Sequence, residues 1–286
     1  MTCASDIDKD TEMKSAVDTD NVTSLDGISP NSRVTSKEVC IFLSEYAEVL
    51  LACGATCIRL DKNVSRMAAA FGKRVEITIL PRHIHMTVCH PGSDDFFTAI
   101  ATVKAIPISF SLNTKLSTLS WNVVDEGLSL REAERRFRKI AASDYENPWR
   151  TLWLASLANA SFCGIFGGDM VAMAIVFVAT VMGFNLKQML CKRHVDVRLV
   201  FFLCAFVSSV IGCADYVFPT GSTPAIALST SVLYLVPGIP FLNSFSDLLY
   251  RHYICAFSRF TDAVVLTACL SLGLLLGVKL MCVSIF

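Results

Sequence analysis

The second half of this 286-residue chain carries very little charge. Of the 25 Lys and Arg and the 25 Asp and Glu, only 7 and 5 follow residue 150. Hydrophobic residues make up 53% of the chain, and the mean hydropathy is +0.53. This is too apolar for one ordinary soluble domain, and the length allows roughly two units at ~150 residues per domain. The scarcity of charge therefore predicts a polar first half in water and an apolar second half in lipid.

Several sequence signals of other protein classes are missing. No Walker A, GxGxxG, GxSxG or HExxH string occurs, so nothing indicates an enzyme. The formal net charge is zero and no basic run is interleaved with aromatics, so nucleic-acid binding is not indicated. Cys53 and Cys57 have the wrong spacing for a zinc or thioredoxin-type motif, and His83 and His85 lack an evident third ligand. We expect no catalytic residue, no metal and no cofactor.

The first 35 residues lack the apolar segment of a signal peptide. They are acidic and polar, which predicts a disordered tail. Without a cleaved signal, the polar region that follows is expected to stay in the cytoplasm.

Residues 36–148 have the pattern of a small cytoplasmic α+β domain. Thr35 and Glu38 form a capping-box signature that opens an amphipathic helix through Leu51. Alternating apolar residues predict a hairpin. The further elements that we expect are a helix at 61–71, strands at 74–80, at 84–90 and within 96–110, and helices at 113–126 and 129–141.

Residues 149–286 are predicted to form a five-helix transmembrane domain. A span needs roughly 20 apolar residues, or fewer if the helix is short or broken. The fold class expected is thus a polytopic α-helical membrane protein, with five transmembrane helices and an N-terminal soluble α/β domain. The five candidate spans are about 151–168, 170–186, 199–215, 223–246 and 262–286.

The charges of the connecting loops predict the orientation. The turn after the first span and the loop after the third have no positive charge, whereas the loops after the second and fourth are basic. The positive-inside rule therefore puts the N-terminal domain in the cytoplasm of an inner (plasma) membrane and the C-terminus outside. The basic residues that we count are Lys187, Lys192, Arg193 and Arg198 after the second span, and Arg251 and Arg259 after the fourth.

Small residues recur at every fourth position of the first span. They are Ser156, Ala160, Gly164 and Gly168. Small residues in this register let two membrane helices approach closely. The stripe predicts helix packing, either within the chain or at a seam with another subunit.

The stretch LVPGIPFLNSFSDLL at 235–249 predicts a broken membrane helix. Pro237 and Pro240 remove two N–H donors and flank Gly238, and polar groups follow directly. Such backbone is tolerated at membrane depth only where protein or water satisfies it, and in transporters it marks the binding site. Asn243 and Asp247 are four residues apart and share one helix face.

Ionisable and amide groups within the spans are functional candidates because lipid makes them costly. Asn159 is in the middle of the first span and is expected to bond across to Asn243 and Asp247; Asp169 closes the first hairpin. Burial of Asp247 in a cavity would favour its protonated form, which would suit proton coupling. The alternative is that Asp247 caps a helix at the cytoplasmic edge. Lys187, Asp262 and Lys279 are close enough to the interfaces to be solvated.

Several separated motifs resemble the threonine/serine exporter family in the same order. They are CGATCIRLDKNVSRMAAAFG, VEITILPRHIHMTV, LNTKLSTLSWNVVDEGLSLREAE, FCGIFGGD and VPGIPFLNSFSDLL, so that the resemblance covers about residues 36–286. Members are single long chains with ten spans or split pairs, one of which exports succinate. This chain is similar to the five-span partner, which implies a second small multi-span subunit of the same family, and a homo-oligomer is a further possibility.

The resemblance implies a subunit of a secondary transporter. The substrates expected are threonine and serine or a C4-dicarboxylate such as succinate, exported by antiport with protons. A regulatory or assembly subunit that does not itself transport is the main alternative. An intramembrane aspartyl protease using Asp169 and Asp247 is disfavoured, because the loop charges put the two carboxylates on opposite sides of the membrane.

Overall fold

The computed structural model describes residues 34–104, 106–143, 147–218 and 221–282. The tail expected over residues 1–35 lies outside these ranges, except for its last two residues. In the first part the elements are α1 Ser36–Ala52, α2 Cys57–Ala70, β1 Arg74–Ile79, β2 His83–Cys89, β3 Phe96–Thr102, α3 Phe110–Asp125 and α4 Leu130–Ser143. In the second part they are α5 Pro148–Ile165, α6 Met170–Lys192, α7 Val197–Gly212, α8 Ala214–Val217, α9 Pro224–Ser231, the 3-10 helix η1 Leu233–Leu235, α10 Gly238–Leu249 and α11 Tyr253–Leu280.

The three strands form one antiparallel sheet with β2 in the centre. The predicted hairpin is therefore present, and its alternation separates two faces. Ile84, Met86 and Val88 are fully buried on one face, whereas His83 and His85 are exposed on the other. The alternation follows from the strand period of two residues.

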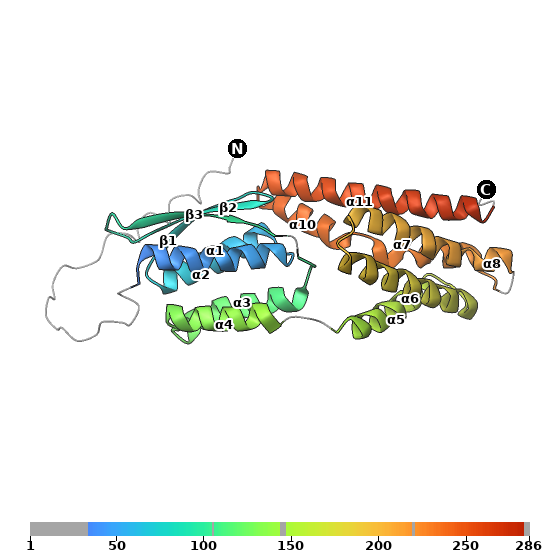
Figure 1. Cartoon of the computed structure of the whole chain (residues 1–286), viewed down its shortest axis with the longest axis horizontal. Helices are drawn as coiled ribbons and strands as arrows, with labels where there is room; N and C mark the ends of the chain where they lie inside the picture. Colours follow the sequence, from blue (N-terminus) through green and yellow to red (C-terminus); the bar gives the residue numbers. More distant parts are fainter. Residues whose placement is uncertain (1–33, 105, 144–146, 219–220, 283–286) are drawn as a thin grey trace, which may run out of the picture.

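Helices α1 and α2 lie between the sheet and the α3–α4 pair, which gives three layers (Figure 1). Tyr46 of α1 is fully buried in the middle layer, and its hydroxyl donates to the Leu116 carbonyl of α3 at 2.9 Å. The Asn63 side chain of α2 donates to the same hydroxyl at 3.2 Å. Burial raises the pKa of Tyr46 well above its ordinary value. The second helix begins at Cys57, four residues before the expected start, and so reaches the region next to α10.

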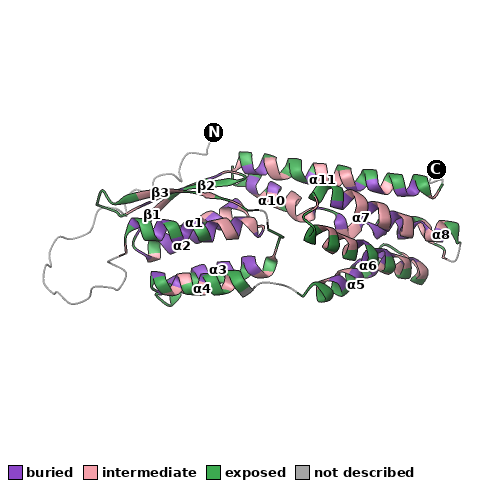
Figure 2. Cartoon of the chain, viewed as in Figure 1, coloured by how far each residue is buried: buried purple, intermediate pink, exposed green. Residues whose placement is uncertain are grey.

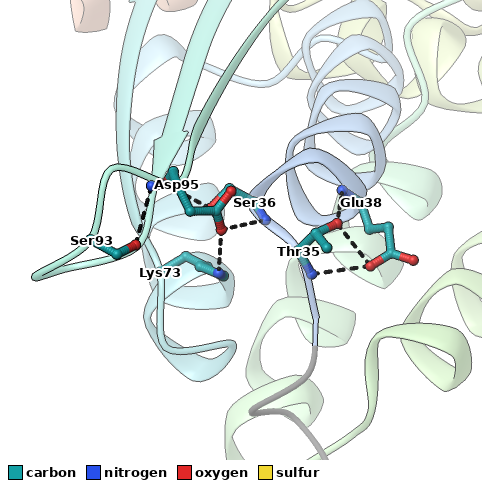
Figure 3. A network of polar contacts seen from close by, with 6 residues as sticks. All are labelled: Thr35, Ser36, Glu38, Lys73, Ser93 and Asp95. Carbon is teal, nitrogen blue, oxygen red and sulfur yellow. Dashed lines mark hydrogen bonds and ion pairs between the residues drawn. The ribbon is translucent and has the colours of Figure 1, made fainter.

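Two groups of polar contacts lie at the start of α1 (Figure 3). The capping box is present: the Glu38 N–H donates to Thr35 Oγ1 at 3.3 Å, and the Thr35 N–H donates to Glu38 Oε2 at 3.1 Å. Asp95, in the turn between β2 and β3, accepts from the Ser36 hydroxyl at 2.7 Å and from Lys73 Nζ at 3.2 Å. Hydrogen bonds from Ser36, with a smaller contribution from Lys73, lower the pKa of Asp95 below its ordinary value.

The second part is a bundle of apolar helices. Three of its described helical segments are long and apolar enough to cross a membrane, namely α6, α7 with α8, and α11. The α9–η1 segment and α10 qualify together as a fourth, bent by 60° at a short break. Figure 2 shows many exposed positions along the outer helices, where a membrane protein meets lipid. The chain is thus a helical membrane protein with three to four candidate spans among its described residues.

The first of the five expected spans corresponds to α5, which does not qualify by length and composition among the described helices. It has 18 residues, and Arg150 and Asn159 reduce its hydropathy. Five spans therefore remain a prediction.

Helix α11 begins nine residues earlier than expected, at Tyr253 instead of 262. Its first turns are held by the first part of the chain: Cys255 is 3% exposed, belongs to the core around α1 and α2, and its thiol lies 3.4 Å from the Ile79 carbonyl. Asp262, expected to open this helix, is therefore an exposed residue inside it.

Candidate functional site

The interrupted helix predicted around Pro237 is present. Helix α9 ends at Ser231, η1 follows, and α10 begins at Gly238 with Pro237 at its N-cap position. No side chain caps the N-terminus of α10, and Pro240 lies in its first turn. The two prolines cannot donate the hydrogen bonds of a continuous helix, which explains the break.

Asn159 lies at this break. Its side chain is 4% exposed, and Nδ2 donates to Thr180 Oγ1 of α6 at 2.7 Å and to the Thr230 carbonyl of α9 at 3.1 Å. The Thr180 hydroxyl in turn donates to the Val176 carbonyl at 2.7 Å. Carbonyls at the end of a helix lack their usual partner four residues on, and in an apolar bundle the protein must supply their hydrogen bonds. The Thr230 carbonyl accepts from the Val232 N–H and from Asn159.

A second polar contact crosses the bundle beside the first. The hydroxyls of Tyr234 in η1 and Ser208 in α7 lie 3.0 Å apart, and Ser208 Oγ also lies 3.3 Å from the Ala179 carbonyl of α6. Gly183 of α6 lies against both hydroxyls, since an added Cβ would overlap with them. Together Asn159, Thr180, Ser208, Thr230 and Tyr234 form what we call the polar centre of the bundle.

Asp247 is fully buried where α10 meets the first part of the chain. Its Oδ2 lies 2.8 Å from Arg259 Nη1 of α11, and its Oδ1 accepts from the Cys57 N–H, the first amide of α2, at 2.9 Å. The Arg259 guanidinium also donates to the Ala55 carbonyl at 2.9 Å. Arg259 had been expected in a basic loop, but here it is one half of a buried ion pair.

Asn243, one turn before Asp247, contacts the same loop between α1 and α2. Its Nδ2 donates to the Gly54 carbonyl at 2.9 Å. The expected bonds from Asn159 to Asn243 and Asp247 are therefore wrong. The Asn159 amide is taken up at the break, whereas the two α10 side chains are taken up by the loop and by Arg259. We call the contacts of Asn243, Asp247 and Arg259 with residues 54–57 the junction.

Asp169 lies at the other end of the bundle, in the turn from α5 to α6 (Figure 1). It caps α6 by accepting from the Ala172 N–H at 2.8 Å, and it accepts from the Ser222 N–H at 2.7 Å and the Thr223 hydroxyl at 3.2 Å. Ser222 and Thr223 immediately precede α9. Asp169 thus holds the start of the interrupted helix, and Asp247 holds its end.

A second carboxylate, that of Asp215, faces the same glycine as Asp169. Asp215 of α8 is 2% exposed and accepts from the Gly221 N–H at 2.7 Å. A Cβ added to Gly221 would lie 2.5 Å from Asp215 Oδ2 and 3.0 Å from Asp169 Oδ2, so both carboxylates face this glycine. Asp169 and Asp247 lie at opposite ends of the bundle, a separation that does not suit an aspartyl protease.

The small-residue stripe lies mostly against the chain's own helices. Ser156 and Ala160 are buried, and a Cβ added to Gly164 would lie 3.2 Å from Met173 Sδ of α6. Gly168 lies beyond the end of α5, in the turn to α6. These are the positions of packing within the chain.

Two further observations concern metal binding and cavities. Among the described residues no group of three or more His, Cys, Asp and Glu could hold a metal ion. An apolar cavity of about 480 Å³ lies between α9 and α11, but no predicted site residue lines it.

Sequence reasoning missed five residues of these clusters. Arg259 was counted only for its charge, and Asp215 was not considered although it follows an apolar run. Thr180, Ser208 and Tyr234 are polar residues within apolar runs, a signal that was available but that does not say which of them meet.

Comparisons with known proteins place the chain in a family. The family model described as "Putative threonine/serine exporter" matches residues 41–281. "Probable succinate transporter subunit YjjP" of Escherichia coli (strain K12) is 28% identical over 233 residues, which cover 81% of this chain and 90% of the relative. The protein of the same name from Klebsiella aerogenes is 26% identical over 244 residues, covering 85% and 92%.

A longer relative also matches. "Probable threonine/serine exporter" of Mycobacterium tuberculosis is 20% identical over 251 residues, which are 85% of this chain but 46% of that protein. No solved structure matches. The relatives are named as transporters or exporters and not as enzymes. The family match covers most of the chain, and the chain belongs to the threonine/serine exporter family.

Proposed function

We propose that this chain is a subunit of a secondary transporter that exports small carboxylate-bearing metabolites, driven by the proton gradient. The observation that carries the proposal is the interrupted helix α9–α10, with the polar centre at its break. The names of the relatives support the substrate class, since they are a succinate transporter subunit and a threonine/serine exporter. All of these compounds carry a carboxylate.

The break offers a carboxylate two kinds of partner. The N-terminus of α10 has no side-chain cap, and the positive end of its dipole attracts anions. The hydroxyl of Tyr234 and the amide of Asn159 lie on the other side of the break, against Ser208 and the end of α9. In this proposal Asn159, Pro237, Gly238 and Pro240 shape the substrate site.

The contacts that hold the two ends of the interrupted helix would be released in turn. Protonation of Asp247 would remove its charge, weaken its pair with Arg259 and free the first amide of α2. The end of α10, with Asn243, could then separate from the junction. At the opposite end, release of Ser222 and Thr223 by Asp169 would free α9. Proton binding at one end would thus couple to access at the other.

Efflux from vesicles tests the proposal. Proteoliposomes that contain the chain and its partner would be loaded with labelled succinate, threonine or serine, and efflux measured with and without a pH gradient. We expect the gradient to accelerate efflux of at least one compound, and Asp247→Asn to abolish that acceleration. Asp262→Asn, an exposed carboxylate of α11, is the matched control. Gradient-dependent efflux that survives Asp247→Asn would exclude the coupling role of Asp247.

The second candidate is a regulatory or assembly subunit that does not transport. It is favoured by the coverage of the Mycobacterium tuberculosis relative, of which this chain matches less than half. A second small multi-span membrane protein would then hold the missing part of the pathway. Affinity purification of the tagged chain identifies such a partner, and cross-linking would detect a homo-oligomer. Efflux from vesicles that contain this chain alone would exclude the second candidate.

A further inference from the structure

Two arginines of α2, Arg59 and Arg66, lie on one face of the helix toward α3. They are seven residues apart, or two turns and about 10.5 Å along the axis. Arg59 Nη1 donates to Asn113 Oδ1 at 2.9 Å. Arg66 Nη1 donates to Ser120 Oγ at 2.7 Å and to Asn63 Oδ1 at 3.1 Å. Neutral groups therefore hold both guanidiniums in place.

Arg66 is fixed by a further contact. Its guanidinium carbon lies 3.6 Å from the centre of the Trp121 ring, over the aromatic face. A cation–π contact orients the planar group without neutralising its charge. Arg66 is half-buried and Arg59 is exposed, so a ligand from solution can reach both.

No carboxylate compensates these two charges within the described residues. Two described acids of this region form ion pairs with another arginine: Arg136 lies 2.8 Å from Glu126 and 3.1 Å from Glu132. Asp61 follows Arg59 by two residues, a spacing that does not face it on a helix. A pair of fixed guanidiniums without a carboxylate partner attracts an anion.

We propose that Arg59 and Arg66 form a binding site for a small dicarboxylate on the face of α2 and α3. The hydrogen bonds of both arginines to described residues use Nη1, and the remaining donors of a guanidinium match a carboxylate with two parallel hydrogen bonds. One carboxylate per guanidinium fits a ligand with two acidic ends. The anion class follows from the guanidiniums alone, whereas the restriction to carboxylates rests on the proposed function.

The position of the site gives it a consequence for transport. The Cys57 N–H, which binds Asp247, is only two residues before Arg59 on the same helix. A dicarboxylate bound to both guanidiniums would link two turns of α2 and so fix the helix end that holds the junction. Binding of cytoplasmic dicarboxylate to the first part of the chain would thus stabilise its contact with α10.

Titration of the full-length chain in detergent tests the site without a partner or a gradient. Sodium succinate is titrated by calorimetry, with neutral succinamide, propionate and inorganic phosphate as comparison ligands. We expect succinate to bind at least tenfold more tightly than propionate, and succinamide not to bind. Arg59→Gln and Arg66→Gln should each weaken succinate binding tenfold or more, and Lys62→Gln, which removes an exposed cation of the same helix, should change it less than twofold.

Three results with the wild-type chain and the arginine variants would overturn the proposal. They are absence of succinate binding to the wild-type chain, phosphate binding as tightly as succinate, and full binding in Arg59→Gln or Arg66→Gln. Asn159→Ala separates this site from the polar centre, because binding should persist in that variant; loss in Asn159→Ala alone also overturns the proposal. Thermal unfolding of each variant shows whether it is folded. Binding that persists while vesicles export none of succinate, threonine and serine would contradict the proposed function and leave this site standing.

Discussion

The Asp247 carboxylate and the Arg259 guanidinium lie 2.8 Å apart, with the carboxylate fully buried and 21% of the Arg259 side chain exposed. The two residues come from α10 and α11; Asp247 also bonds to the first amide of α2, and Arg259 to the loop between α1 and α2. One ion pair therefore joins the interrupted helix, the last helix and the first part of the chain.

Removing either member of this pair should destabilise the protein strongly, because the other charge is left buried without its partner. We expect Asp247→Asn and Arg259→Gln each to cost about 3 kcal/mol. The double variant should lose clearly less than the sum of the two. Thermal unfolding of the purified chain and both single and double variants measures the coupling. Strictly additive losses would contradict it.

Asn159→Ala should loosen the bundle at the break. The variant removes the interhelical donor of the Thr230 carbonyl, which keeps only the Val232 N–H, and interhelical hydrogen bonds of this kind are worth about 1 kcal/mol. A lower unfolding temperature and slower efflux are expected. The control is Ser161→Ala on the same helix, since Ser161 is exposed and donates to its own backbone at Leu157. Equal effects of the two substitutions would argue against the polar centre.

Gly183→Ala should be destabilising because the new methyl overlaps with the hydroxyls of Tyr234 and Ser208. Overpacking of this kind typically costs about 1–3 kcal/mol. Adding Ser208→Ala should recover part of the loss. At Gly164 the nearest atom is the flexible Met173 sulfur at 3.2 Å, so Gly164→Ala should have a smaller effect. Unfolding temperatures of the three variants and the wild type give the comparison.

Asp95 should make the first part of the chain more stable above about pH 4 than below it. Hydrogen bonds from Ser36 lower the folded-state pKa below the unfolded value of about 3.9. A lowered carboxyl pKa stabilises fully above the unfolded value, and the stabilisation is lost as pH falls through the folded value. Unfolding temperatures of wild type and Asp95→Asn should therefore differ at pH 6 and converge in acid. The exposed neighbour Asp94→Asn serves as control, and a constant gap would contradict the assignment.

Two natural cysteines can test the expected orientation. Cys191 near the end of α6 and Cys282 just after α11 are both exposed. In single-cysteine variants of intact cells, an impermeant maleimide should label Cys282 from outside, whereas Cys191 should react only after the membrane is opened. Labelling of Cys191 from outside would reverse the predicted topology.

Local patterns sufficed for much of the secondary structure. The capping box at Thr35 and Glu38 opens α1, and the alternation of β2 separates its buried and exposed faces. The prolines at 237 and 240 interrupt the fourth apolar segment as expected. These features depend on neighbours a few residues away, which the chain displays directly.

The partners of the candidate side chains could not be predicted in this way. Asn159 was expected to meet Asn243 and Asp247, but its amide binds residues 21 and 71 positions away, on α6 and α9. Asp247 binds Cys57, 190 positions earlier. Such contacts depend on the direction in which α10 leaves the break, and no local pattern contains that angle.

The amino-acid sequence by itself thus determined the polar and apolar halves, the break at Pro237 and the choice of Asn159, Asp169 and Asp247 as candidates. Each of these follows from the cost of placing charge, free amides or proline in lipid, which is a property of the residue and its neighbours. Only the tertiary structure decided that Asp247 pairs with Arg259 against α2 and that Asn159 donates to a carbonyl of the broken helix. Those pairings arise because a buried polar group takes the nearest partner that the packed helices supply.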